Sequence, residues 1–285
     1  MSDVGTGQLR GMSSATSQVK HTASRAADSK PLEYVARGGF IGYGIIHLLF
    51  AWIAFQVAFR GSSQVSDQSG ALQTLTGNSV GKVLLVLIGI GMIGLAIWQA
   101  FEAIIGESGP RTKTAIAERV ISGFRAILYL LLAWYAVNVL RGAKASMADS
   151  QQSKSAGIMA HQGGRWLVGF IGLVVIGVGI GIFVYGARKK FVKHLNTQQM
   201  AASVRKSTIR LGMAGYTAKG VAYAIAGVLV VAAAVTSEPD KARGLDAALK
   251  TLAGHPWGVW LLALIGLGIA AFGIYCFAQA RYRKV

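Results

Sequence analysis

Six long apolar runs constrain the fold of this chain more than any other feature of its sequence. A helix needs about 20 consecutive apolar residues to cross the hydrocarbon core of a bilayer, which is roughly 30 Å thick. Only helices and closed barrels satisfy every backbone polar group in lipid, and these runs lack the two-residue alternation of barrel strands. We therefore predict an all-α integral membrane bundle of six transmembrane helices. The predicted spans are residues 38–59, 83–105, 120–140, 166–187, 211–235 and 259–280.

The overall composition agrees with a membrane protein. Only 14% of the 285 residues are charged, whereas soluble domains carry about 25% charged residues. The chain also contains 37 glycines, and glycine is more frequent in transmembrane helices than in soluble ones.

The net charge of +18 is distributed unevenly between the two sides of the predicted bundle. Eighteen of the 29 Lys and Arg residues lie in the termini and in the loops after the second and fourth spans, whereas nine lie in the three opposite loops. Positive charge accumulates in cytoplasmic loops, so we expect a multi-pass protein with both termini in the cytoplasm. The richest basic stretch, ARKKFVKHL at residues 187–195, favours attraction to anionic lipids. No recognised nucleic-acid-binding module accompanies it, so we expect no nucleic-acid partner.

The sequence repeats one two-span unit three times. The second span of each unit begins with a related stretch, which is GKVLLVLIGIG at Gly81, GRWLVGFIGLV at Gly164 and GVWLLALIGLG at Gly258. The loops at residues 71–81 and 248–258 share six identical positions without gaps. Because each unit contains an even number of spans, successive copies enter the membrane in the same orientation. We predict three parallel two-helix repeats around a pseudo-threefold axis.

The repeats divide the chain into an N-terminal tail and three units. Residues 1–33 are rich in Ser, Thr and Ala and lack the apolar centre of a secretory signal. We expect this stretch to be a disordered cytoplasmic tail. Repeat 1 then covers residues 34–110, repeat 2 covers 111–196 and repeat 3 covers 207–285.

Short helices are expected in the outer loops. In the stretch DAALKTLAG, Asp246 is the predicted N-cap and Gly254 the predicted C-terminal stop. Ser69 and Gly77 bracket the corresponding element of repeat 1. We expect these helices to lie flat over the outer mouth of the bundle, while the outer loop of repeat 2 lacks this signature.

One candidate polar site lies deep in the membrane. His47 is 12 residues from the outer end of its span, which places it about 12 Å inside the cytoplasmic boundary. A histidine cannot reach water from that depth, so it should face the bundle interior and bond to another helix. The repeat alignment puts Tyr129 and Tyr223 at the equivalent positions, so these three rings are predicted to converge near the axis. A structural hydrogen-bond layer and a proton or substrate site are both consistent with this pattern.

A second candidate site lies nearer the cytoplasm. Lys219 and Arg125 occupy equivalent repeat positions, at depths of about 6 and 8 Å, from which long side chains reach the headgroups. Tyr43 shares their alignment position, and Glu102 near the inner end of span 2 is a suitable ion-pair partner. We hypothesise that Tyr43, Glu102, Arg125 and Lys219 form a layer that holds an anionic headgroup.

The chain resembles a bacterial family of membrane proteins known as domain of unknown function 1206, whose two-span unit is usually present three times. The resemblance rests on GYTAKGVAY at residues 215–223, AALKTLAGHPWG at 247–258 and WLLALIGLG at 260–268, and it covers about residues 34–285. It implies the triplicated architecture and a bacterial plasma-membrane location. It implies no activity, because the family has no established one.

The residue types favour a protein without catalytic chemistry. The predicted spans contain no Asp, no HExxH motif occurs, and the five histidines are scattered, so we expect no enzyme activity, no metal site and no cofactor. The first functional prediction is a non-enzymatic envelope-organising protein whose partners are membrane lipids, including anionic ones, and another membrane protein. The alternative is a small-solute or proton transporter or channel with a central site at His47, Tyr129 and Tyr223.

Overall fold

The computed structural model describes residues 30–60, 67–105, 113–143 and 146–284. The described residues form helices and no strand, and six helices are long and apolar enough to cross a membrane. Each of the six contains one predicted apolar run, so the all-α prediction is confirmed. The predicted tail falls almost entirely outside the described residues. The long helices are α2 (Lys30–Arg60), α4 (Ser79–Ile105), α5 (Lys113–Leu140), α7 (Gly164–Ala187), α8 (Ala202–Thr236) and α10 (Gly258–Tyr282).

Shorter elements connect the long helices. Each connection between the two long helices of a repeat carries one short α-helix, which is α3 (Gln68–Gln73), α6 (Met147–Met159) or α9 (Leu245–Ala253). We call these the outer helices, after the predicted orientation. Four 3-10 helices complete the described elements, namely η1 (Thr74–Gly77), η2 (Lys190–His194), η3 (Thr197–Gln199) and η4 (Pro239–Ala242).

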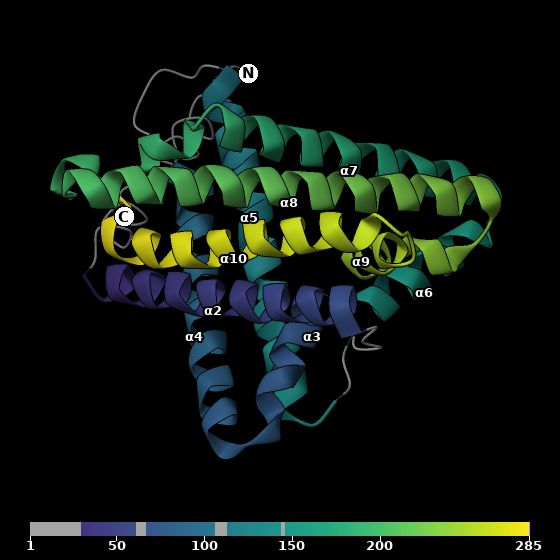
Figure 1. The fold of residues 1–285 in the computed structure, drawn as a ribbon, viewed down its shortest axis with the longest axis horizontal. Helices are drawn as coiled ribbons and strands as arrows, with labels where there is room; N and C mark the ends of the chain where they lie inside the picture. Colours follow the sequence, from purple (N-terminus) through teal and green to yellow (C-terminus); the bar gives the residue numbers. More distant parts are fainter. Residues whose placement is uncertain (1–29, 61–66, 106–112, 144–145, 285) are drawn as a thin grey trace, which may run out of the picture.

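The long helices pack as a series of neighbours in the order α5, α4, α2, α10, α8 and α7. The second helix of each repeat packs against the first helix of the next, which pairs α4 with α5, α7 with α8 and α10 with α2. Within repeats 1 and 3, α2 packs against α4 and α8 against α10. In repeat 2, the described parts of α5 and α7 pack together hardly at all, so the series does not close into a ring there. In Figure 1, α7, α8, α10 and α2 run side by side, while α4 and α5 run across them.

Glycines allow the closest helix approaches. On α7, Gly172 and Gly179 lie against α8, and on α8, Gly220 and Gly227 lie against α7. A Cβ atom added at Gly220 would lie 2.5 Å from the backbone nitrogen of Phe183. No side chain fits between these two backbones, which explains why small residues recur along both helices.

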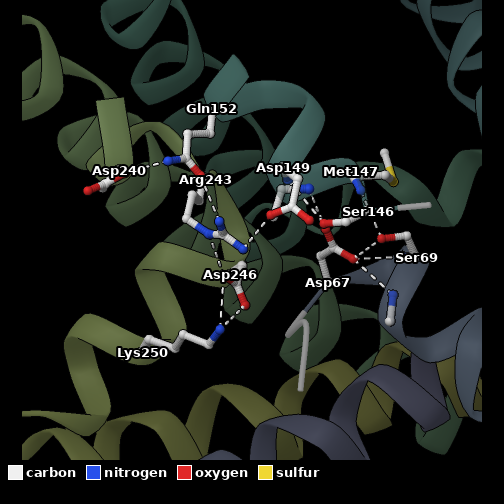
Figure 2. A network of polar contacts seen from close by, with 12 residues as sticks. Asp67, Ser69, Ser146, Met147, Asp149, Gln152, Asp240, Arg243, Asp246 and Lys250 are labelled. Carbon is white, nitrogen blue, oxygen red and sulfur yellow. Dashed lines mark hydrogen bonds and ion pairs between the residues drawn. The ribbon is translucent and has the colours of Figure 1, made fainter. Parts of the chain in front are cut away.

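The outer helix of repeat 1 is tied to that of repeat 2 by Asp67 (Figure 2). One carboxylate oxygen of Asp67 accepts hydrogen bonds from the backbone nitrogens of Ser69 at 2.8 Å and Gly70 at 3.0 Å. The other oxygen accepts one from Ala148 N, at the start of α6, at 3.0 Å. Ser69 Oγ in turn accepts a hydrogen bond from Met147 N at 3.0 Å. The predicted bracket at Ser69 is therefore wrong, because Asp67 is the N-cap of α3, whereas η1 does end at Gly77.

The outer helix of repeat 3 is tied to that of repeat 2 by Arg243 (Figure 2). Its guanidinium forms an ion pair with Asp149 of α6 at 2.7 Å and donates a hydrogen bond to Gln152 Oε1 at 2.7 Å. It also pairs with Asp246, whose side chain is fully buried and also pairs with Lys250. The prediction that Asp246 caps α9 is wrong, because Gly244 starts the helix earlier with a positive φ of 63°. Gly254 is the C-cap, as predicted.

These contacts make α6 the centre of the outer cap, which we define as α3, α6, α9 and η4. The sequence of α6 lacks the signature shared by the other two outer loops, yet its helix bonds to both. Its N-cap is Ser146, whose side chain accepts a hydrogen bond from Asp149 N at 3.0 Å. The outer cap thus joins all three repeats through polar contacts.

Candidate functional site

The ammonium group of Lys219 lies between helices from two repeats. Lys219 Nζ donates a hydrogen bond to Tyr43 Oη at 3.2 Å and lies 3.2 Å from His47 Nε2. It also lies 4.0 Å from the centre of the Phe272 ring, a favourable cation–π position. Tyr43 and His47 come from α2, Lys219 from α8 and Phe272 from α10. We call these four residues the lysine cluster.

The hydrogen-bond partners of His47 indicate which of its ring nitrogens carries the hydrogen. His47 is 1% exposed, and its Nδ1 lies 2.8 Å from the backbone oxygen of Tyr43, one turn earlier on α2. A carbonyl oxygen only accepts, so Nδ1 carries the hydrogen and Nε2 is left as an acceptor. That acceptor faces the Lys219 ammonium, which only donates. The pair is therefore a neutral histidine that accepts a hydrogen bond from a charged lysine.

The predicted convergence of three rings occurs only in part. Tyr129 of α5 lies edge-on to the Tyr43 ring, with centroids 5.2 Å apart, and Tyr43 lies edge-on to His47 at 4.3 Å. Tyr223 makes no hydrogen bond or ring contact with these residues in the described part of the chain. Instead, Tyr43 contacts Lys219. These two residues occupy equivalent positions in repeats 1 and 3. Lys219 and Tyr223 are one helical turn apart on the same side of α8, so they lie at different depths, and the contacts with Tyr43 and His47 occur at the depth of Lys219.

The predicted headgroup layer separates into the lysine cluster and a second group at the inner end of the bundle. Glu102 accepts a hydrogen bond from Ser122 Oγ at 3.2 Å and lies 3.9 Å from the guanidinium of Arg283. Arg125 is close enough to Glu102 and to Tyr129 to interact electrostatically with both. We call Arg125, Arg283 and Glu102 the arginine cluster.

Arg283 is the site residue that sequence reasoning missed. The charge distribution assigns it to the basic cytoplasmic end of the chain, where a solvated side chain is expected, yet it is 7% exposed. Its guanidinium lies over the rings of Trp98 at 4.6 Å and Phe40 at 5.1 Å. The backbone around it bonds to the α7–α8 connection, with Asn196 N donating to Tyr282 O at 2.7 Å. No periodicity or motif in the sequence signals a contact between these two distant segments.

Several positively charged side chains lie near Arg283. His194, in the α7–α8 connection, is half-buried, and its backbone oxygen accepts a hydrogen bond from Lys284 N at 3.0 Å. Burial, together with the nearby positive charges of Arg283, Lys193 and Arg125, lowers the pKa of His194 from 6.5 to about 4. His194 therefore stays neutral at physiological pH, as a group surrounded by cations should.

The described residues contain no group of three or more His, Cys, Asp or Glu side chains that could hold a metal ion. The two clusters instead present hydrogen-bond donors and cations among aromatic rings. Such an arrangement can bind an anion or hold a proton that moves between a lysine and a histidine.

Comparison with known proteins gives the family of the chain. The family described as Domain of Unknown Function (DUF1206) matches three times, at residues 38–106, 122–189 and 214–283. The chain belongs to this family. Each match contains one pair of long helices, which confirms the triplication.

A relative covers nearly the same length. The uncharacterized protein YxxB of Bacillus subtilis (strain 168) is 33% identical over 260 residues, which is 90% of this chain and 94% of the relative. No solved structure matches the chain. The family and this relative establish what the chain is similar to, and neither description names an activity.

Proposed function

We propose that this family member is a non-enzymatic plasma-membrane protein that binds acidic lipid headgroups and organises lipid and protein partners in the envelope. One observation carries the proposal: the ammonium of Lys219 is held between helices by neutral partners only. No carboxylate of the described residues lies within ion-pair distance of it. An uncompensated charge in the membrane interior is costly, so such a group marks a ligand site or an ion pathway.

The proposed orientation places both termini in the cytoplasm. In Figure 1 the start of α2, the α7–α8 connection and the end of α10 lie at one end of the molecule. These segments are rich in Lys and Arg, and basic residues favour the cytoplasmic side. Reporters fused after residue 285 and inserted in the outer loop of repeat 3 test this directly. Activity of a cytoplasmic reporter at the C-terminus is expected, and activity of a periplasmic reporter there would refute the orientation.

Lipid analysis of the purified protein tests the binding proposal. Lys219→Met keeps the length of the side chain and removes its charge, so we expect the amount of co-purified acidic lipid per protein to fall several-fold. Lys206→Met is the matched control, because Lys206 is exposed on the same helix. Unchanged acidic lipid in Lys219→Met, or an equal fall in both variants, would contradict the proposal.

A proton or small-solute transporter is the second candidate. The observation that favours it is the 3.2 Å separation of Lys219 Nζ and His47 Nε2, a pair between which a proton can pass. Proteoliposomes loaded with a pH-sensitive dye distinguish the two candidates. A proton leak that disappears in His47→Leu would favour transport, whereas wild-type protein that leaks no more than empty liposomes would favour lipid binding.

A further inference from the structure

Resting on the proposed function, we infer that the bound headgroup is a phosphomonoester carrying two negative charges, and that Arg283, in the segment after α10, forms the inner half of its site together with Arg125. The inference goes beyond acidic lipids in general, because it names the charge and the chemistry of the headgroup. It also makes the C-terminal segment part of the binding site.

Arg283 is positioned at the depth of a lipid headgroup. α10 contains 25 residues, so it extends about 37 Å, somewhat more than the hydrocarbon core of roughly 30 Å. Arg283 follows the last residue of α10 and therefore lies near the inner headgroups. Its side chain is held there, stacked on Trp98 and Phe40, by a backbone that is bonded to residues 194–196.

The guanidinium of Arg283 retains unused hydrogen-bonding capacity. Its Nε is buried and has no hydrogen-bond partner among the described residues. Its nearest carboxylate, Glu102, lies 3.9 Å away, which is an ion-pair distance and too long for a hydrogen bond. A guanidinium offers five donors in a planar fork that matches phosphate oxygens, and a buried donor without a partner is rare. A phosphate group satisfies such a fork.

Arg125 faces the same set of rings as Arg283. Both guanidinium groups interact electrostatically with Tyr129, Tyr185 and Tyr216, which come from α5, α7 and α8. Lys219 interacts electrostatically with Arg125 in turn. Arg125 is therefore within electrostatic reach of both the rings around Arg283 and the ammonium of Lys219, so it links the arginine cluster to the lysine cluster.

The charge balance of this region requires more than one negative charge. Lys219, Arg125 and Arg283 contribute three positive charges, and Glu102 contributes one negative charge. The sum of +2 is uncompensated in an environment where desolvation of each charge is expensive. A phosphodiester headgroup carries one negative charge, whereas a phosphomonoester carries about −1.5 to −2 at pH 7. Of these two groups, the monoester comes closer to balancing the cations.

Enrichment from mixed membranes tests the inference. The intact protein is reconstituted into vesicles of neutral lipid containing equal fractions of phosphatidic acid, a monoester, and phosphatidylglycerol, a diester. The lipids that remain bound after extraction are then quantified. We expect wild-type protein to enrich phosphatidic acid over phosphatidylglycerol several-fold, and Arg283→Met to reduce this ratio to near one while still retaining acidic lipid. Arg281→Met is the control, because Arg281 is exposed two positions earlier.

A second variant keeps the test decisive if Arg283→Met fails to fold. Glu102→Gln removes the competing carboxylate and leaves a larger positive excess, so it should raise the enrichment of phosphatidic acid. A lower enrichment in Glu102→Gln, or equal enrichment of both lipids by wild-type protein, would overturn the inference while leaving acidic-lipid binding intact. Absence of any acidic-lipid enrichment would instead overturn the proposed function itself.

Inorganic phosphate distinguishes a lipid headgroup from a soluble phosphate. Excess inorganic phosphate added during the extraction should leave phosphatidic acid bound, because the acyl chains contribute to retention. Full displacement of the lipid by millimolar phosphate would show that the site takes a free phosphate, and it would overturn the lipid assignment.

Discussion

Lys219 and His47 are 172 residues apart in the sequence, on the third and first repeats, yet their side-chain nitrogens lie 3.2 Å apart. The contact exists because α10 packs against both α2 and α8 and brings them together around Phe272. His47 Nε2 accepts a hydrogen bond from the ammonium, and His47 Nδ1 donates one to the backbone oxygen of Tyr43. The buried lysine therefore depends on a residue from another repeat.

We expect His47→Leu to lower the stability of the protein by about 2–3 kcal/mol, because the buried ammonium loses one of its two hydrogen-bond acceptors. Lys219→Met should lower the stability less than His47→Leu does, because the groups that lose a partner, Tyr43 and His47, are neutral. The double variant should be more stable than His47→Leu alone, because no charge then remains without a partner. Thermal unfolding of the four proteins in detergent measures these differences. A double variant less stable than His47→Leu would contradict the assigned hydrogen bond.

Two glycines of α7 should respond to alanine in opposite directions. A Cβ atom at Gly179 would lie 2.6 Å from Ala224 N of α8, whereas one at Gly177 meets nothing within 4 Å. Gly179→Ala should therefore cost about 1–3 kcal/mol through overpacking. Gly177→Ala should be neutral or stabilising by up to about 1 kcal/mol, because alanine is the better helix former. Equal effects of the two substitutions on the unfolding temperature would show that the α7–α8 packing is wrong.

Loss of the Asp67 carboxylate should loosen the outer cap. Asp67→Ala leaves three backbone N–H groups of α3 and α6 without their acceptor, so we expect a loss of about 2 kcal/mol. Hydrogen exchange should accelerate at the start of α6, where Ala148 N loses its bond. Asp240→Ala is the control. Asp240 is exposed, and its carboxylate accepts a hydrogen bond from the side chain of Gln152. Unchanged exchange at Ala148 in Asp67→Ala would count against the joint between repeats.

Acid should weaken the contact between the C-terminal segment and the α7–α8 connection. The pKa of His194 is lowered by folding from 6.5 to about 4, so between these values the unfolded chain binds a proton that the folded chain does not. Stability contributed by neutral His194 is complete above pH 6.5 and is lost as the pH falls toward 4. Allowing for solvent screening of a half-buried group, the effect is on the order of 1 kcal/mol.

Unfolding temperatures at pH 7.5 and pH 5 check this dependence. We expect the drop between the two pH values to be smaller in His194→Gln, which cannot take up a proton, than in wild type. Lys193→Gln is a useful comparison, because it removes a neighbouring cation and keeps the titrating ring. An identical drop in wild type and His194→Gln would assign the acid sensitivity to other groups.

The sequence alone determines the elements and their repetition. An apolar run of about 20 residues has few alternatives to a spanning helix, because lipid leaves no other way to satisfy the backbone. The three matching stretches at Gly81, Gly164 and Gly258 then imply three copies of one helix pair, and DUF1206 matches the same three regions. The depths of His47, Lys219 and Arg125 follow from the run lengths by the rise per residue.

Only the tertiary structure decided which polar side chains meet. Depth along a helix is set by sequence position, but the direction of a side chain around the bundle depends on how each helix is rotated and which neighbours it packs against. Packing between repeats brings Lys219 to Tyr43 and His47, and it brings Glu102 within 3.9 Å of Arg283 from the far end of the chain. Asp67 and Arg243 joined loops that share no sequence signature with α6. Such contacts arise from packing between distant segments, which no local pattern of residues encodes.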